Sequence, residues 1–259
     1  MNPTSSVSPI SIRATGVSIA GACDRQQRIA GFDQDKFSHS HVLCVGAGGL
    51  ISNIAPSLAR KGIGALTILD HDEVDVSNLN RQRFYARDIG LNKAIALVRN
   101  LQAECTCGTI LTGYAMSLET AIHQDIDLDC GVAVCGVDNS SARVTTAQYF
   151  RKRSIPVIFT AVSADTDHGY VLIQAPDGPC VGCLFPDMDA DGTVPCPGTP
   201  AIADILQLMG ALVTYGLESI LTGRKRSWNY RAVHLSSGEW DTATVLARKS
   251  DCRICTRKM

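Results

Sequence analysis

Short blocks of continuous hydrophobic residues alternate, through the middle of the chain, with segments in which apolar positions recur at helical spacing. The blocks at 42–45, 66–69, 130–137 and 155–161 are typical of strands buried on both faces of a parallel sheet. Helical spacing follows the first block and recurs at 92–104 and 140–153, with a further strand expected at 109–115 and a short helix at 117–124. This order predicts an α/β fold: a mostly parallel sheet with right-handed crossovers and helices on both faces.

The pattern changes after residue 169. Segments 170–174, 227–235 and 242–247 are short and alternate apolar with polar residues, which predicts an antiparallel extension of the sheet. A loop rich in glycine and proline at 176–200 and a helix at 201–221 follow the first of these strands. No repeat or low-complexity linker divides the chain. We therefore expect a flexible tail over residues 1–22, rich in serine and threonine, and a single domain over 23–259.

A glycine-rich turn joins the first apolar block to the helix after it. The turn is Gly46-Ala47-Gly48-Gly49, and Asp70 ends the next strand. Glycine lets the backbone turn sharply and brings a helix N-terminus close to a phosphate, while a carboxylate at the second strand's end accepts hydrogen bonds from a ribose. This Rossmann-like arrangement predicts a nucleotide pocket. Dinucleotide dehydrogenases share it, so the turn alone does not identify the nucleotide.

An unusually polar and cationic segment follows the aspartate. Asn78 and Arg81 lie in the run S-N-L-N-R-Q-R-F at 77–84, and Lys93 comes shortly after. A dehydrogenase has no use for these side chains there, whereas an enzyme that handles a triphosphate does. In this order the motifs resemble those of the ThiF/MoeB/HesA family of adenylating enzymes, which are related to ubiquitin-activating enzymes. The resemblance runs from about Arg25 to Cys255.

In that family the glycine turn, the aspartate, the S-N-L-x-R-Q motif and the lysine form one ATP site. The resemblance implies that the nucleotide is held by Gly46, Gly48, Gly49, Asp70, Asn78, Arg81, Lys93, Asp138 and Asn139. Asp70 would bind the ribose, Gly49 would back the phosphates, and Asp138, after the strand at 130–137, would hold Mg²⁺. The sequence departs from the family pattern G-x-G-G-L-G where Ile51 replaces the last glycine, which usually eases helix–strand packing.

An element of the form R-Q-x-x-x-x-G-F precedes the first strand and starts at Arg25. In the family its arginine reaches into the ATP site of the partner subunit, and the spacing to Gly31 favours Arg25 over Arg28 for that role. A catalytic arginine that acts in trans implies a dimer, and a homodimer is the simplest one. The alternative is that both arginines are solvated on a surface helix.

Two C-x-x-C pairs lie far apart in the chain, Cys180 with Cys183 and Cys252 with Cys255. Four thiolates at this spacing are typical of a closed, tetrahedral structural Zn²⁺ site, which leaves no position for a substrate. The family often carries the same four-cysteine site. A redox C-x-x-C is the competing interpretation, but it would open a helix after a strand and gives no reason for two pairs.

Cys196 lies between two prolines in the loop before the 201–221 helix. Related enzymes place there a cysteine that takes the activated acyl group, so Cys196 is a candidate catalytic thiol. Several single-domain members work without a thioester, and an incidental loop cysteine is the alternative.

The resemblance implies ATP-dependent adenylation of the C-terminal glycine of a ubiquitin-like or sulfur-carrier protein that ends in Gly-Gly. A conjugating enzyme or a sulfur donor would then act on the product, and the sequence does not identify the carrier. One alternative is a relative that adenylates a small-molecule, peptide or tRNA-attached carboxylate. Another is an inactive scaffold, which is disfavoured because Arg81, Lys93 and Asp138 are intact.

Composition narrows these possibilities. The chain has 259 residues, 45% of them hydrophobic, and a net charge of −1. This charge gives no electrostatic reason to expect a nucleic-acid or membrane partner. No secretory signal or membrane-spanning apolar run is visible, and several of the 11 cysteines lie in buried strand-like sequence, where reduced thiols are expected. We therefore expect a cytoplasmic enzyme.

Overall fold

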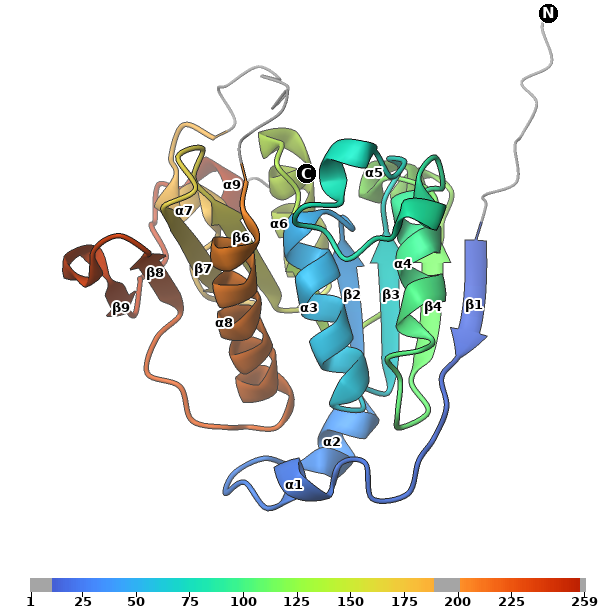
Figure 1. Ribbon diagram of the computed structural model, residues 1–259. Coiled ribbons are helices and arrows are strands. Elements are labelled where there is room, and N and C mark those ends of the chain that lie inside the picture. The colour runs from blue at the N-terminus through green and yellow to red at the C-terminus, as the bar shows by residue number, and fades with distance from the viewer. Residues whose placement is uncertain (1–10, 189–200, 257–259) are drawn as a thin grey trace, which may run out of the picture.

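A single sheet organises the computed structural model, which describes residues 11–188 and 201–256 (Figure 1). Its nine strands in these residues lie in the order β1-β4-β3-β2-β5-β6-β7-β8-β9. Their bounds are β1 Ser11–Thr15, β2 His41–Val45, β3 Ala65–Leu69, β4 Ile110–Tyr114, β5 Val132–Cys135, β6 Val157–Val162, β7 His168–Gln174, β8 Tyr230–His234 and β9 Thr242–Thr244. The predicted α/β fold with a large sheet and helices is confirmed.

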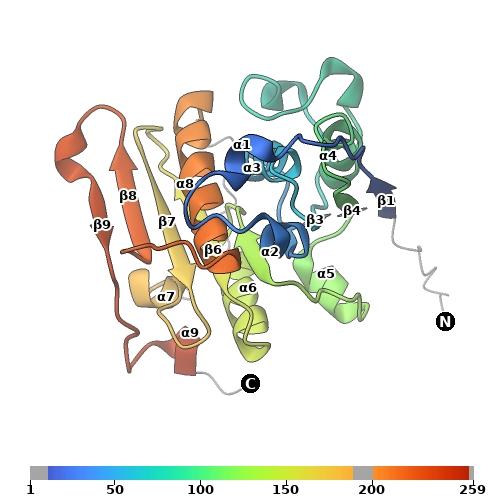
Figure 2. The same ribbon diagram turned by 90° about the horizontal axis from the view of Figure 1, so that it is seen from below.

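Helices cover both faces of the sheet. Their bounds are α1 Asp24–Gln27, α2 Gln34–Ser38, α3 Gly49–Arg60, α4 Lys93–Leu101, α5 Leu118–His123, α6 Ser140–Lys152, α7 Val181–Leu184, α8 Ala203–Leu221 and α9 Arg253–Thr256, with 3-10 turns at η1 Val76–Asn78, η2 Ala86–Asp88 and η3 Gly238–Trp240. Helices α3, α4 and α8 lie on one face, and α5, α6, α7 and α9 lie on the other (Figures 1 and 2).

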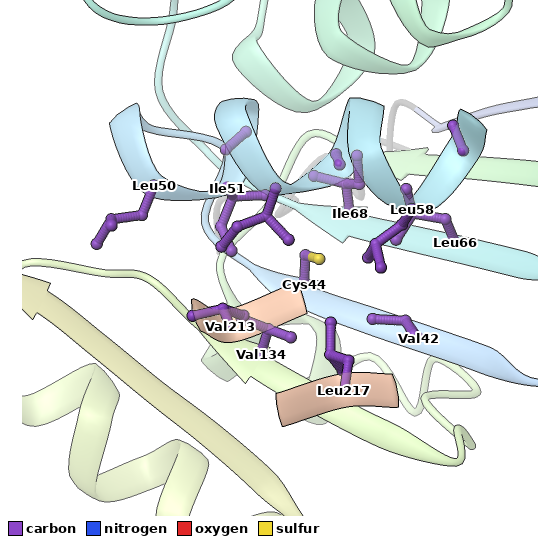
Figure 3. Packing of buried hydrophobic residues seen from close by; sticks show 14 of the residues in the cluster. Val42, Cys44, Leu50, Ile51, Leu58, Leu66, Ile68, Val134, Val213 and Leu217 are labelled. Atoms are coloured by element: carbon purple, nitrogen blue, oxygen red, sulfur yellow. The ribbon is translucent and has the colours of Figure 1, made fainter. Parts of the chain in front are cut away.

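The continuous apolar strands feed both faces at once. In β2, Val42 and Cys44 join the cluster under α3 and α8, whereas Leu43 and Val45 join the cluster on the opposite face. Figure 3 shows Ile51 and Leu58 of α3 packed over β2. Because successive strand residues point to opposite sides, a strand covered on both faces must be apolar at every position.

Strand direction places the site. Strands β4, β3, β2, β5 and β6 are parallel, so their carboxyl ends lie at one edge of the sheet. Strands β7, β8 and β9 continue the sheet antiparallel to their neighbours. Ligands of parallel α/β sheets bind at the carboxyl edge, beyond the strand ends.

Strand β1 differs from the flexible tail expected over residues 1–22. Residues 11–15 pair antiparallel with β4, from Ser11 opposite Tyr114 to Thr15 opposite Ile110. The sequence S-I-R-A-T alternates, and Ile12 and Ala14 pack against the core while their neighbours are exposed. A single alternating segment of five residues with a polar face covers one edge of the sheet, which is too weak a signal to read in isolation.

By length and composition α8 would be able to cross a membrane. Polar residues such as Thr214 and Glu218 lie within it, so the sequence shows no continuous apolar run of that length. In the fold α8 packs against α3, β6 and β7, and its apolar residues Met209, Val213 and Leu217 are fully buried. These contacts are those of a core helix.

Candidate active site

A cavity of about 350 Å³ lies at the carboxyl edge of the parallel strands. Every residue predicted to bind nucleotide lines it: Gly46, Gly48, Gly49, Asp70, Asn78, Arg81, Lys93, Asp138 and Asn139. They come from the ends of β3, β2 and β5 and from the segments that follow, which the sheet order brings side by side. The fold therefore assembles the predicted set in one place, while the individual roles stay predictions.

One glycine makes the turn after β2 possible, and a second leaves the start of α3 uncovered. Gly46 has a φ of +98°, a backbone conformation that residues with a Cβ rarely adopt. Its amide donates to the carbonyl oxygen of Leu69 at 2.8 Å. Gly48 precedes the first residue of α3, and a Cβ built there would meet no atom within 4 Å. The first turn of α3 therefore opens onto free space, as an anion site at a helix N-terminus requires.

Gly49 has a packing role that sequence reasoning missed. A Cβ at Gly49 would lie 2.8 Å from Cδ1 of Leu206, so the absence of a side chain lets α3 and α8 approach closely. The prediction gave Gly49 to the phosphates alone.

The departure at Ile51 is accommodated by another glycine. Ile51 is fully buried, and a Cβ on Gly136 at the end of β5 would lie only 2.9 Å from its Cγ1. Gly136 thus provides the space that the family's glycine would have provided at position 51. Residues 46 and 48 keep their places in the turn.

Asp70 holds two parts of the cavity wall together. One carboxylate oxygen accepts from the amide of Ala47 at 2.6 Å and the other from the amide of Asp72 at 2.8 Å. Burial raises the pKa of Asp70 above its ordinary value, and these two amides and the nearby Lys93 oppose the rise. Each oxygen still has a second lone pair for a ligand hydroxyl.

The cationic side of the cavity is built from the segment after β3. Lys93 begins α4 and pairs with Asp72, Nζ to Oδ2, at 2.9 Å. The Lys93 side chain is 12% exposed and that of Asp72 is 53% exposed. Arg81 donates through Nη1 to the carbonyl oxygen of Ser77 at 2.7 Å and to Asn80 Oδ1 at 2.9 Å. No carboxylate pairs with Arg81 among the described residues, so its charge is available to an anion.

Two amide side chains fix this segment. Asn78 Oδ1 accepts from the amide of Asp75 at 3.1 Å, which closes the turn η1. Asn53 of α3 donates through Nδ2 to the carbonyl oxygens of Gly49 at 2.6 Å and Arg81 at 3.1 Å. This role of Asn53 was not predicted from the sequence. Asn53 belongs to no motif, and an asparagine inside an amphipathic helix gives no sign of its tertiary partner.

The other side of the cavity is formed by the end of β5 and the start of α6. Asp138 follows β5, and Asn139 caps α6 by accepting from the amide of Ala142 at 2.7 Å. Arg143 in the second turn of α6 also lines the cavity and was missed. Its spacing after Asp138 and Asn139 on a capped helix was a usable signal, since it places the guanidinium near the same strand end.

Arg25 does not line the cavity of its own chain. It lies on α1, at the end of the sheet opposite the carboxyl edge, and is exposed (Figure 1). Arg28 is paired with Asp24 at 2.7 Å, whereas Arg25 forms no ion pair within residues 11–188 and 201–256. Cys196 falls outside the described residues.

The four predicted zinc ligands form one cluster. The sulfur atoms of Cys180, Cys183, Cys252 and Cys255 all lie within 4.8 Å of one another. The sulfur–sulfur distances are 3.1 Å for Cys180–Cys255, 3.6 Å for Cys180–Cys252 and 3.5 Å for Cys183–Cys255. Four sulfurs at about 2.3 Å from one ion would be about 3.8 Å apart, so the donor set is close to that of tetrahedral zinc. The cluster joins α7 to α9, which lie on the face of the sheet that also carries α5 and α6 (Figure 2).

Comparisons with known proteins agree with this geometry. A model of the ThiF family matches residues 23–254. The chain is 29% identical over 228 residues to the SAMP-activating enzyme E1 of Haloferax volcanii, covering 86% of this chain and 82% of that protein. It is 26% identical to the adenylyltransferase and sulfurtransferase MOCS3 of Caenorhabditis briggsae, covering 91% of this chain but only 60% of that protein.

Among solved structures, Escherichia coli MccB with AMPCPP and MccA matches with a TM-score of 0.72 at 20% identity. The match covers 86% of this chain and 68% of that chain. At this identity the likeness concerns the fold.

Proposed function

The chain belongs to the ThiF family, and from that membership we propose that it is an ATP-dependent adenylyltransferase that activates the C-terminal carboxylate of a small ubiquitin-like or sulfur-carrier protein. The observation that carries the proposal is the single cavity in which the glycine turn, Arg81, Lys93 and Asp138 meet. The names of the SAMP-activating enzyme E1 and of the adenylyltransferase MOCS3 support the same reaction class.

The cavity offers each part of ATP a complementary group. The amides at the start of α3 suit the phosphates, because the space beside Gly48 is open. Asp70 suits the ribose hydroxyls, and Asn78 and Asn139 complete the polar wall. Arg81 and Lys93 suit the phosphate charge.

The reaction then needs charge neutralisation more than proton transfer. A C-terminal carboxyl group has a pKa of about 3.3–3.7 in water, so it is already a nucleophilic carboxylate at neutral pH. One carboxylate oxygen bonds to the α-phosphorus of ATP, the bond from that phosphorus to the β-phosphate bridging oxygen breaks, and pyrophosphate leaves with the electron pair. The chain's task is to align two anions and to offset the charge that develops on the phosphates.

Mg²⁺ fits the donor set at Asp138, because hard carboxylate and phosphate oxygens are the ligands it prefers. When bound there it would supply further neutralisation of the phosphates. The substitution Asp138→Ala should therefore affect the reaction through the loss of one ligand.

The substrate tail should end in Gly-Gly, since a tail without side chains can reach the α-phosphate without a steric clash. A second substrate class has its own support: MccB, which shares the fold, was crystallised with MccA, so a peptide carboxylate is the alternative. After activation, a sulfur donor or a conjugating enzyme would take the acyl group.

We extend the proposal to a homodimer in which Arg25 acts on the partner's site. Its exposure and its distance along the sheet from the cavity of its own chain support a role in trans. The test is to mix Arg25→Ala with Asp138→Ala, each inactive alone. A mixed dimer has one site with an intact Asp138 and an Arg25 supplied by the other chain, so activity should return on mixing. No recovery after verified subunit exchange contradicts the role in trans.

We also propose that the four-cysteine cluster holds one structural Zn²⁺, in a reducing cytoplasm that keeps the thiols free. For Cys196 the support is its sequence position alone, and we propose that it receives the acyl group from the adenylate as a thioester. Neither the zinc nor Cys196 enters the adenylation step.

The experiment that tests the proposed activity is exchange of labelled pyrophosphate into ATP. Exchange should depend on Mg²⁺ and on a carrier or synthetic peptide that ends in Gly-Gly with a free carboxylate. The same peptide with a C-terminal amide is the matched control and should give background exchange. Equal exchange with the two peptides, or exchange with neither over a panel of Gly-Gly carriers, contradicts the proposal.

A further inference from the structure

Arg143 is held at two points on the cavity wall. Its Nε donates to the carbonyl oxygen of Val137 at 2.9 Å, and its Nη1 donates to the hydroxyl of Tyr170 at 2.8 Å. The first contact fixes it to the end of β5 and the second to β7, so the guanidinium spans from the parallel core to the antiparallel extension. An arginine restrained in this way is already ordered before any ligand arrives.

Its charge is not neutralised by the described part of the chain. No carboxylate pairs with Arg143 within residues 11–188 and 201–256, and both of its hydrogen-bond acceptors are neutral groups. Burial raises the pKa of Tyr170 above its ordinary value, so its phenol stays uncharged at neutral pH. A guanidinium has five N–H donors, and the two contacts use two of them. The remaining donors and the full positive charge are left for an anion in the cavity.

The sheet order separates Arg143 from the other cations of the cavity. The cations Arg81 and Lys93 come after the end of β3, where Asp70 also lies, and the glycine turn lies at the end of β2. Arg143 lies beyond these, at β5, with Ala161 and Val162 of β6 as neighbouring cavity walls. A nucleotide with its ribose at Asp70 and its phosphates at the glycine turn fills the β3–β2 side. The group that meets it from the β5–β7 side is the second reactant.

We propose that Arg143 binds the carboxylate of the substrate's C-terminal residue and presents it to the nucleotide. A planar guanidinium matches a carboxylate in geometry and charge, and its rigid attachment to Val137 fixes that carboxylate beside Asp138. Tyr170 is a positioning residue, since it acts by holding Arg143. This inference rests on the proposed function and names the residue by which the same site distinguishes a carboxylate from other chain ends.

A binding experiment tests this assignment without catalysis. The protein is loaded with a non-hydrolysable ATP analogue and titrated with a Gly-Gly peptide that has a free carboxylate, and then with its C-terminal amide. In wild type the carboxylate peptide should bind about 10- to 100-fold more tightly than the amide, the range expected for a charge-assisted hydrogen-bonded pair. In Arg143→Ala the two peptides should bind equally, and Arg143→Lys should recover part of the difference.

Two further variants separate binding from folding effects. Tyr170→Phe should reduce the preference for the carboxylate severalfold, since Arg143 keeps its charge but loses one anchor. Lys152→Ala removes a charge from an exposed position on the same helix and should behave as wild type. Affinity for the ATP analogue alone should stay within about twofold of wild type in Arg143→Ala, which also shows that the variant is folded.

The outcomes are distinct. Retained discrimination in Arg143→Ala overturns the assignment while leaving the proposed function intact. A fall in affinity for the ATP analogue as large as the fall for the peptide makes Arg143 a phosphate ligand and also overturns it. A wild type that binds both peptides equally contradicts the carboxylate substrate, and the assignment with it.

Discussion

At the scale of single residues, the same side chains build the cavity and supply its charge. Asp70 uses both carboxylate oxygens to fix the backbone of Ala47 and Asp72, and Asp72 in turn orients Lys93. The orientation of the Lys93 side chain therefore depends, through Asp72 and Asp70, on the backbone of the glycine turn. Because the Asp72 partner is half exposed, a phosphate can compete with it for Lys93 at small cost.

The cations and Asp138 should therefore govern rate with little effect on stability. Arg81→Ala and Lys93→Ala should each lower carrier-dependent pyrophosphate exchange by about 10²–10³-fold, since they remove charge that stabilises the transition state. Asp138→Ala should abolish exchange. Thermal unfolding should change little, because Lys93 loses only a partly exposed ion pair. The control is Lys36→Ala, which removes an exposed lysine far from the cavity and should leave exchange unchanged. Unaltered exchange in Asp138→Ala removes the metal assignment.

The thiol at position 196 is predicted to act after adenylation. Cys196→Ala should leave pyrophosphate exchange largely intact, because the carboxylate is the nucleophile in that step. It should remove a thiol-sensitive enzyme–carrier adduct on non-reducing gels, since a thiolate is required to attack the activated carbonyl. Cys44 is a control: it is fully buried, and burial raises its pKa well above its ordinary value, so Cys44→Ser should leave the adduct in place. If wild type forms no adduct, Cys196 is incidental and the adenylate passes directly to an outside acceptor.

The cavity residues that belong to contiguous motifs could be predicted from the sequence. Those that are defined by tertiary contacts could not. Gly46, Asp70 and Lys93 could be found because turn, strand end and helix start each have a local pattern. Asn53 and Arg143 sit inside helices, where the pattern reports only which face is buried. Their partners, the backbone of Arg81 and the hydroxyl of Tyr170, become neighbours only when the sheet forms.

At the scale of elements, the strand–turn–helix unit from β2 to α3 depends on a glycine that lies outside it in sequence. Ile51 fills space that is free only because Gly136 at the end of β5 has no side chain. The unit is thus matched to its neighbouring strand by volume. From sequence alone Ile51 was an unexplained departure, because the compensating glycine is 85 residues away.

This match in volume predicts that substitutions at Gly136 and Ile51 have coupled effects on the free energy of unfolding. Gly136→Ala should cost about 1–3 kcal/mol in the free energy of unfolding, since its Cβ would lie 2.9 Å from Ile51 Cγ1. In an Ile51→Ala background, which removes the clashing atom, the same substitution should cost at least about 1 kcal/mol less. Denaturant unfolding of the four proteins measures the coupling. Gly238→Ala, whose Cβ would meet nothing within 4 Å, is the control. Additive effects would show that the two residues do not share one space.

Element boundaries followed the same division. Helices α5 and α6 lie within one or two residues of their predicted bounds because Ser117 and Asn139 cap them, accepting from Thr120 and Ala142. Strand β1 was missed because its alternation is short and its identity as a strand comes from pairing with β4. Caps are local signals, whereas an edge strand is defined by its neighbour.

At the scale of the whole molecule, the antiparallel extension has less helical cover than the parallel core. Behind it lie two helices of four residues each, α7 and α9, joined by the four cysteines (Figure 2). Helices this short do not hold together by themselves. A metal that ties them would replace the missing hydrophobic packing, which is why the spacing of cysteines in the sequence was informative about tertiary structure.

Metal analysis of purified protein should accordingly find about one zinc per chain, and strong chelators or Cys180→Ser should lower the unfolding temperature before exchange activity in the remaining folded protein changes. Cys130→Ser, at a buried cysteine outside the cluster, is the control and should keep the zinc. A metal-free wild type of full stability contradicts the assignment.

The central claim is that the carboxylate attacks the α-phosphorus of ATP, and an oxygen label tests it most directly. A Gly-Gly peptide or carrier with ¹⁸O in its terminal carboxylate is incubated with the enzyme, Mg²⁺ and ATP, and the activated acyl group is trapped with hydroxylamine. Hydroxylamine attacks the carbonyl carbon, so AMP leaves with the bridging oxygen from the carboxylate. Mass spectrometry should find one ¹⁸O in AMP, with unlabelled pyrophosphate as the other product. ADP together with ¹⁸O in inorganic phosphate would place the attack on the γ-phosphorus and contradict the account.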